Sequence, residues 1–172
     1  MKNTYPVSAL NSLSCENFAA ILGPVFEHSP WIAEATWPKR PFADLERLHR
    51  ALCETVRAAD QEKQLALIRA HPDLVGRAAL AGELTSTSTA EQTSAGLDKV
   101  AAAEIAAFQK FNQAYRDRFG FPFVICARLN RKEAILKAFP LRLKHSRGQE
   151  IQTALEEIGK IAYLRLQDIV QT

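Results

Sequence analysis

Hydrophobic residues recur three or four positions apart over most of the chain, which is the spacing of one face of an α-helix. The longest such run extends from Leu97 to Phe119, and Gly120 is suited to end it because glycine readily adopts the left-handed conformation of a helix end. Shorter runs each follow a residue that can cap a helix N-terminus, namely Ser14, Asp44 and Asp60. The pattern therefore predicts an all-α fold.

Further helix starts are predicted from capping signals. Ser29 precedes a proline, which is favoured at the first position of a helix. Three segments have the spacing of a capping box. In this motif two residues three positions apart each accept, with the side chain, a hydrogen bond from the backbone amide of the other. These pairs are Ser88 with Glu91, Asn130 with Glu133, and Ser146 with Gln149. We expect Pro140 to end the helix that follows Asn130.

One segment departs from the helical pattern. Residues 121–126 are too short and too rich in strand-forming residues for a helix, and no other segment is an obvious strand partner. A buried extended segment without a partner strand leaves backbone groups that must bond something else, and a ligand is one possibility. We therefore predict a single compact multi-helix domain over residues 1–172, with a short extended Phe-Pro-Phe-Val segment.

Composition and charge narrow the class of protein. The chain has 172 residues, 47% of them hydrophobic and 24% charged, which is ordinary for one globular domain. The net charge is only +3 and no long block of like charge occurs, so we expect no nucleic-acid partner. No apolar run is long enough to span a membrane or to form a signal peptide. Three widely spaced cysteines fit no disulfide framework, so we expect a reducing compartment, the cytoplasm.

His71 is the first candidate for chemistry. It follows the helix that begins after Asp60, and Pro72 disfavours a helical conformation for the residue before it. The ring is therefore directed by a turn rather than by the helix, and its ordinary pKa lies near neutrality. The alternative is a helix-end histidine that only bonds nearby carbonyl groups.

Two further charged residues are candidates, each with a structural alternative. Arg165 falls on the apolar stripe of the last helix, so it needs a buried carboxylate or a bound anion. Asp73 and Glu150 are the two carboxylates that we consider for a structural ion pair. Glu91 has the alternative of being only a capping residue.

Together, four features suit a planar, polar, anionic molecule. A helix N-terminus at Ser88 offers amide donors to negative charge, the extended segment offers backbone groups, Arg165 can bind a carboxylate, and His71 can supply a proton. The sequence has no glycine-rich phosphate loop, no GxSxG motif and no zinc-ligand spacing. Nucleotide, serine-hydrolase and zinc chemistry are therefore disfavoured.

Several short segments together have a recognisable pattern. They are Glu27-His28-Ser29-Pro30-Trp31, Arg40-Pro41-Phe42, Ala70-His71-Pro72-Asp73-Leu74, Ser88-Thr89-Ala90-Glu91-Gln92 with Ala95-Gly96-Leu97, Phe111-Asn112 with Tyr115, Phe119-Gly120-Phe121-Pro122-Phe123-Val124, and Ile161-Ala162 with Arg165-Leu166. In this order, over nearly the whole chain, the sequence resembles the 2-oxo-4-hydroxy-4-carboxy-5-ureidoimidazoline (OHCU) decarboxylase family.

The resemblance implies an all-helical, generally dimeric enzyme of urate degradation that uses no cofactor or metal. It would convert OHCU to (S)-allantoin by loss of carbon dioxide and protonation of one face. Carried onto this sequence, the resemblance gives His71 as proton donor, Glu91 as its partner carboxylate and Arg165 as a third catalytic residue. It also gives the substrate-contacting positions Pro72, Ser88, Thr89, Ala90, Glu91, Gln92, Phe123, Val124, Ile125, Cys126 and Ala127.

Two alternatives of other classes remain open from the sequence. One is a non-catalytic helical interaction or regulatory domain, although the long helix lacks the arginine-rich stripe expected for binding in a nucleic-acid groove. The other is a metal hydrolase built from His28, His49, His71 and Glu91, whose spacing gives it little support.

Overall fold

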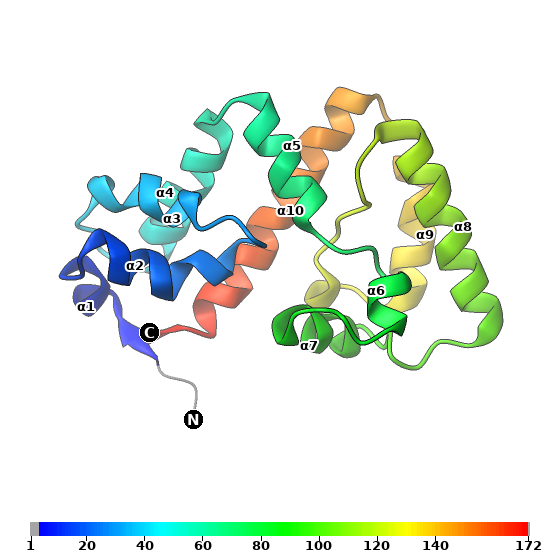
Figure 1. The fold of residues 1–172 in the computed structure, drawn as a ribbon, viewed down its shortest axis with the longest axis horizontal. Helices are drawn as coiled ribbons and strands as arrows, with labels where there is room; N and C mark the ends of the chain where they lie inside the picture. The colour runs from blue at the N-terminus through cyan, green and yellow to red at the C-terminus, as the bar shows by residue number, and fades with distance from the viewer. Residues whose placement is uncertain (1–3, 172) are drawn as a thin grey trace. The chain divides into compact units, whose positions relative to one another are not determined.

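The computed structural model describes residues 4–171, without the side chains of Arg77 and Ala78. Most of these residues are helical, which confirms the predicted fold class (Figure 1). The chain divides into two compact units. The first unit comprises residues 1–70 and 159–172, and the second comprises residues 71–158.

The first unit is a group of short helices with a very small sheet. Helix α3 packs against both α2 and α4. The strands β1 (Tyr5–Pro6) and β2 (Val170–Gln171) pair in parallel and are too short to show in a hydrophobic pattern. The core includes Phe18, Leu22, Ile32, Leu48 and Leu52, all fully buried. The helices of this unit are α1 (Val7–Asn11), α2 (Cys15–Leu22), η1 (Gly23–Val25), α3 (Trp31–Thr36), η2 (Trp37–Lys39), α4 (Leu45–Ala58) and α5 (Gln61–Ala70).

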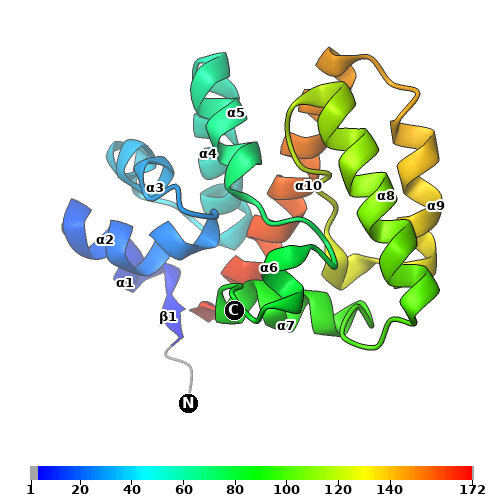
Figure 2. The same ribbon diagram turned by 45° about the vertical axis from the view of Figure 1, so that its right-hand side comes forward.

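The second unit is built around a cluster of aromatic rings. Its helices are α6 (Arg77–Leu80), α7 (Ser86–Ser94), α8 (Ala102–Phe119), η3 (Ala127–Leu129), α9 (Lys132–Arg142) and the part of α10 (Arg147–Gln167) up to Ile158. Helices α8 and α9 lie side by side (Figure 2). Between them Phe139 stacks on Phe111 and on Phe123, with ring centroids 5.3 and 3.9 Å apart. Tyr115 contacts the ring of Phe123 as well, so the extended segment is fixed by the helices that surround it.

Several predicted helix ends are confirmed. The side chains of Ser14, Asp44 and Asp60 each accept a hydrogen bond from the backbone amide three residues later. Gly120 ends α8 with φ +78°, in the left-handed region. Ser146 and Gln149 form the predicted reciprocal capping box before α10.

Two predicted helix starts are wrong because a neighbouring residue begins the helix. Helix α3 begins at Trp31 without a side-chain cap, and Ser29 Oγ donates to the carbonyl of Glu27 instead. Helix α7 begins at Ser86, two residues before the predicted start at Ser88, because Thr85 serves as its N-cap.

The predicted bounds around α9 and α8 are also wrong. Asn130 does not cap α9, since its side chain donates to the carbonyl of Cys126 and the helix starts after Arg131. Pro140 lies inside α9 rather than after it. Helix α8 begins at Ala102, five residues after the predicted start of its apolar run. None of the helices that the structure describes is long and apolar enough to cross a membrane.

The N-terminus of α8 offers a test of a charged contact in the second unit. Glu104 accepts hydrogen bonds from the amide of Ala101 (2.8 Å) and from Nζ of Lys132 (2.9 Å). The Lys132 bond, followed by the Ala101 amide, holds the pKa of Glu104 below its ordinary value of 4.5. A lowered pKa in the folded state means that this carboxylate stabilises the fold above about pH 4.5, and that the contribution is lost as the pH falls.

We therefore expect Glu104→Gln to lower the melting temperature at pH 7 and to lower it less at pH 3. Thermal unfolding followed by circular dichroism at both pH values measures this difference. Glu133→Gln, at an exposed position in the first turn of α9, is the matched control and should change little at either pH. An equal loss at pH 3 and pH 7 for Glu104→Gln would show that its charge is not the stabilising feature.

Candidate functional site

The predicted histidine lies in a turn that follows α5. Helix α5 ends at Ala70, so His71 is outside the helix, as predicted from Pro72. The imidazole is buried, with 6% of His71 exposed. Pro72 is half-buried. The turn continues to Gly76, and its backbone is hydrogen-bonded to a side chain of α7, since Oε1 of Gln92 accepts from the amide of Val75 (3.1 Å).

Helix α7 carries five predicted site residues. Ser88 and Gln92 are buried, Glu91 is half-buried, and Thr89 and Ala90 are exposed. Because Thr85 Oγ1 accepts from the amide of Ser88 (3.2 Å), the capping role falls to Thr85. The structural alternative for Glu91, a capping-box residue, is therefore wrong.

The predicted extended segment is confirmed, and buried charged side chains bond two of its backbone groups. No strand is assigned between residues 121 and 126, within the part of the chain that the structure describes. Arg142 Nη1 donates to the carbonyl of Val124 (2.6 Å), and a carboxylate oxygen of Glu157 accepts from the amide of Cys126 (2.8 Å). Side chains of α9 and α10 thus form two of the backbone hydrogen bonds that a partner strand would otherwise form.

Arg142 belongs to a buried network of charged and aromatic residues. Glu150 is fully buried and accepts hydrogen bonds from Arg142 Nη2 (2.8 Å), from His145 Nδ1 (2.7 Å) and from the hydroxyl of Tyr115. Burial, followed by the bond to Glu150, raises the pKa of Tyr115 far above its ordinary value. Tyr115 is therefore a neutral hydrogen-bond donor at physiological pH. The guanidinium of Arg142 lies 4.3 Å from the ring centroid of Phe123.

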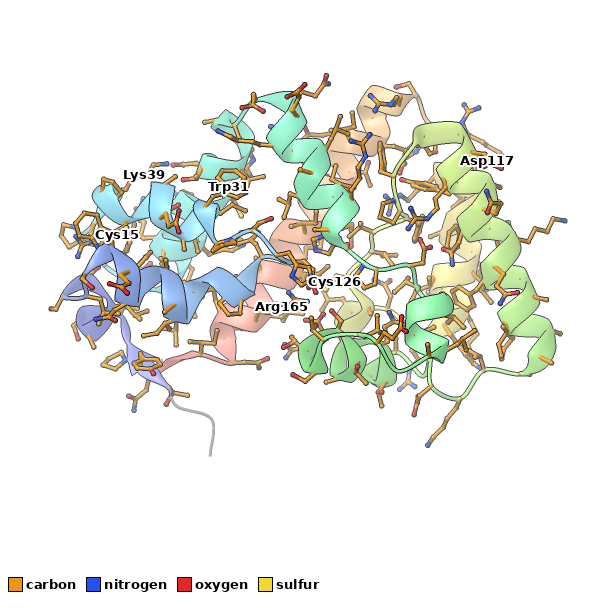
Figure 3. All side chains as sticks on the ribbon, in the orientation of Figure 1. Cys15, Trp31, Lys39, Asp117, Cys126 and Arg165 are labelled. Carbon is orange, nitrogen blue, oxygen red and sulfur yellow. The ribbon has the colours of Figure 1, made fainter. Side chains whose placement is uncertain are left out.

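The structure brings three of the predicted features together within the second unit. Gln92 joins the His71 turn to α7, and α7 packs against η3, which begins at Ala127. Burial raises the pKa of the Cys126 thiol, and the nearby charges of Glu157 and Glu91 raise it further. Figure 3 labels Cys126. Phe123, Val124, Cys126 and Ala127 are buried and Ile125 is half-buried.

Arg165 belongs to the first unit, where it forms a buried ion pair. It lies on α10 (Figure 3), and its Nη1 donates to a carboxylate oxygen of Glu27 at 3.0 Å. Each of the two side chains is only 5% exposed. Neither of the two carboxylates considered from the sequence forms an ion pair with Arg165. Asp73 pairs with Arg116, and Glu150 pairs with Arg142.

The buried pair makes a single substitution of Arg165 ambiguous. We expect Arg165→Met to lower the free energy of unfolding by about 3–5 kcal/mol, because Glu27 would stay buried without this cation. The double variant Arg165→Met/Glu27→Gln should recover much of that loss in urea denaturation. If Arg165 also binds substrate, the double variant should fold and still show a raised KM. A folded double variant with normal kinetics would leave Arg165 a structural role only.

The charged residues that hold the extended segment, Arg142 and Glu157, are not among the site residues predicted from the sequence. Glu150 and Glu157 lie on the same stripe of α10 as Ala154 and Ile161, and buried carboxylates on an apolar stripe were a usable signal. Arg142 follows Ile135 and Phe139 at helical spacing. That signal was hidden by the wrong expectation that Pro140 ends the helix.

The residues named for the metal-hydrolase alternative have other contacts. His49 Nε2 donates to the carbonyl of Gly159 (2.8 Å) and lies 3.3 Å from Sγ of Cys53. The exposed ring of His28 lies 3.9 Å from the carboxylate of Glu27. Over residues 4–171, no three His, Cys, Asp or Glu side chains are grouped so that they could hold a metal ion.

Comparison with known proteins identifies the family. The family model for OHCU decarboxylase matches residues 11–167. The chain is 46% identical over 162 residues to the 2-oxo-4-hydroxy-4-carboxy-5-ureidoimidazoline decarboxylase of Amia calva, covering 94% of this chain and 93% of that relative. It is 44% identical over 163 residues to the decarboxylase of the same name from Halalkalicoccus jeotgali, covering 95% and 90% of the two chains.

A solved structure is also similar to this chain. The crystal structure of an (S)-allantoin synthase matches with a TM-score of 0.79 and 30% sequence identity over 97% of this chain. This chain spans about half of that one, 54% of its length. A family match over residues 11–167 and relatives above 40% identity over nearly their whole length agree. The chain belongs to the OHCU decarboxylase family.

Proposed function

We propose that this chain decarboxylates OHCU to (S)-allantoin in urate degradation, with His71 as the proton donor. The observation that carries the proposal is the convergence, within one unit of a family member, of a buried histidine turn, helix α7 and the extended segment. These are the three features that the sequence indicated for a planar anionic substrate.

The chemistry requires a proton at one face of the substrate. The bond between the ring carbon and the carboxylate breaks, carbon dioxide leaves, and the electron pair remains on the ring, where the adjacent C=N group delocalises it. A proton from the imidazolium of His71 then forms the new C–H bond on one face, at the carbon of that C=N group. The hydroxyl proton passes to the ring nitrogen, so that the hydroxyl becomes a carbonyl, and solvent returns a proton to the imidazole. An imidazole is suited to this step because its ordinary pKa lies near neutrality.

The other site residues have binding and orienting roles in this proposal. Glu91 would orient His71 or hydrogen-bond the substrate, a role supported by its half-buried position one turn after the buried Ser88. Arg165 or the N-terminus of α7 would hold an anionic or carbonyl group of the substrate. Backbone groups of residues 123–127 that are not already bonded would bind the ring edges. The bonded groups are the Val124 carbonyl, the amide and carbonyl of Cys126, and the Ala127 carbonyl.

The test is to supply OHCU and measure its decay. OHCU is generated enzymatically from urate, and its disappearance is followed by ultraviolet absorbance while circular dichroism follows the formation of (S)-allantoin. The proposal expects faster decay than in buffer and an optically active product. No acceleration over buffer would overturn it and would favour the non-catalytic interaction domain.

We expect Glu91→Gln to lower kcat by about tenfold or more, because the amide keeps the shape of the side chain but not its charge. The melting temperature should be close to that of the unchanged protein, since Thr85 is the cap of α7. Glu133→Gln, at an exposed position on α9, is the matched control for both measurements. Near-normal turnover in a folded Glu91→Gln variant would remove Glu91 from the mechanism.

We further propose that the two units form one decarboxylase domain, that the protein is a homodimer and that it resides in the cytoplasm. The family match across both units supports one domain. Three exposed leucines of the second unit, Leu80, Leu129 and Leu141, offer apolar surface for a dimer contact. The three cysteines are free thiols, as suits a reducing compartment. Light scattering of the purified protein measures its mass and tests the dimer.

A further inference from the structure

The turn that follows His71 contains a strained residue. Val75 has φ +50°, in the left-handed region, which β-branched residues rarely adopt. Its side chain is buried, with 1% exposed, so the residue is fixed in the core of the second unit. Such a conformation persists only where the surrounding structure holds it in place.

Two buried amide side chains hold the backbone of this residue and of the two residues before it. Gln92 accepts from the amide of Val75 (3.1 Å) and donates to the carbonyl of Asp73 (3.4 Å). Asn112 Nδ2, from α8, donates to the carbonyl of Leu74 (2.9 Å). The side chains of Gln92 and Asn112 belong to residues that are only 7% and 5% exposed. Three consecutive residues of the turn are therefore fixed by hydrogen bonds from two helices.

The unpartnered side-chain oxygen of Asn112 indicates that its amide donor is the group that matters. Its Oδ1 atom is buried and, among the residues that the structure describes, meets no hydrogen-bond partner. A buried acceptor without a partner is unfavourable, and a leucine of similar size would avoid it. The bond from Nδ2 to Leu74 is the interaction that a leucine could not make.

We propose that Gln92 and Asn112 are positioning residues for the decarboxylation, acting through the turn on the ring of His71. The inference rests on the proposed role of His71 as proton donor. The rigid Pro72 separates His71 from Asp73, so a shift of the clamped residues moves the backbone that carries the imidazole. In this proposal the side chain of Gln92 positions the turn, whereas the family resemblance implies a substrate contact. The reason is that both polar atoms of the side chain bond the turn.

The test compares Gln92→Met and Asn112→Leu with Gln113→Met. Gln113 is exposed on α8, and its side chain bonds Asp117 on the same helix, so its variant is the matched control. We expect each clamp variant to lower kcat by about 10- to 100-fold. KM should change by less than about threefold, since a positioning residue does not touch the substrate. The optical purity of the allantoin should fall as well.

Nuclear magnetic resonance of the free protein provides a readout independent of turnover. The His71 ring resonances, and their shift with pH, should move in Gln92→Met and Asn112→Leu and stay unchanged in Gln113→Met. Gln92→Glu keeps the acceptor for the Val75 amide, loses the donor to the Asp73 carbonyl and adds a buried negative charge, so its kcat should stay low. Asn112→Leu carries the test if Gln92→Met does not fold.

The outcomes separate this proposal from the function on which it rests. A raised KM with unchanged kcat would overturn it and make these residues substrate contacts. Unmoved His71 resonances in folded variants would overturn it as well. If a His71→Asn variant kept full activity, the proton-donor role would fail, whereas the resonances would still report whether the two amides position the ring.

Discussion

Replacing His71 by asparagine is expected to lower kcat/KM for OHCU about 10³-fold, because general acid–base groups contribute about 10²- to 10⁴-fold. Asparagine is smaller but polar, and position 71 lies in a turn outside any helix, so the fold should survive. The residual allantoin should lose optical purity, since no fixed group would deliver the proton to one face. Absorbance measures the rate, and circular dichroism measures the enantiomeric excess.

The matched control for this variant is His28→Asn. His28 is exposed and has φ +47°, a region that asparagine enters more readily than most residues. Its substitution should leave kcat/KM within about twofold, well under the effect of losing an acid–base group. If His71→Asn produced (S)-allantoin of full optical purity at an undiminished rate, His71 would not be the proton donor.

The helices were predictable where a single local signal decides them. Asp44 and Asp60 cap their helices as expected, and Gly120 ends the longest apolar run, because these effects depend on a few neighbouring residues. One error occurs where two local signals compete. Thr85 and Ser88 are both good caps, and in the structure Thr85 caps α7 while Ser88 is buried in the first turns of the helix.

The candidate site shows a similar division. The position of His71 outside the helix agrees with the effect of Pro72, which disfavours a helical preceding residue, although Pro140 lies inside α9 and shows that a proline alone does not end a helix. The partners of the extended segment are not local, since Arg142 and Glu157 come from helices 18 and 31 residues away along the chain. Pairing of Arg165 with Glu27 spans 138 residues, and no periodicity within one helix can reveal it.

The second substitution with a large expected effect is that of Arg142. We expect Arg142→Met to lower the free energy of unfolding by about 3–5 kcal/mol, since Glu150 would remain fully buried without its cation. The Val124 carbonyl would lose its donor at the same time, so turnover should fall in any folded fraction. Urea denaturation followed by circular dichroism measures the stability. Arg131→Met, at an exposed arginine before the same helix, is the control and should change stability by less than about 0.5 kcal/mol.

A double variant separates the two causes of the expected loss. Arg142→Met/Glu150→Gln removes the buried negative charge together with its cation, and Tyr115 and His145 can still bond the amide. Because an unpaired charge costs more than a neutral amide, the double variant should be more stable than Arg142→Met by at least about 1 kcal/mol. Its turnover should remain low, since nothing replaces the bond to the Val124 carbonyl. A double variant no more stable than the single one would show that packing against Phe123, rather than the charge of Glu150, makes Arg142 important.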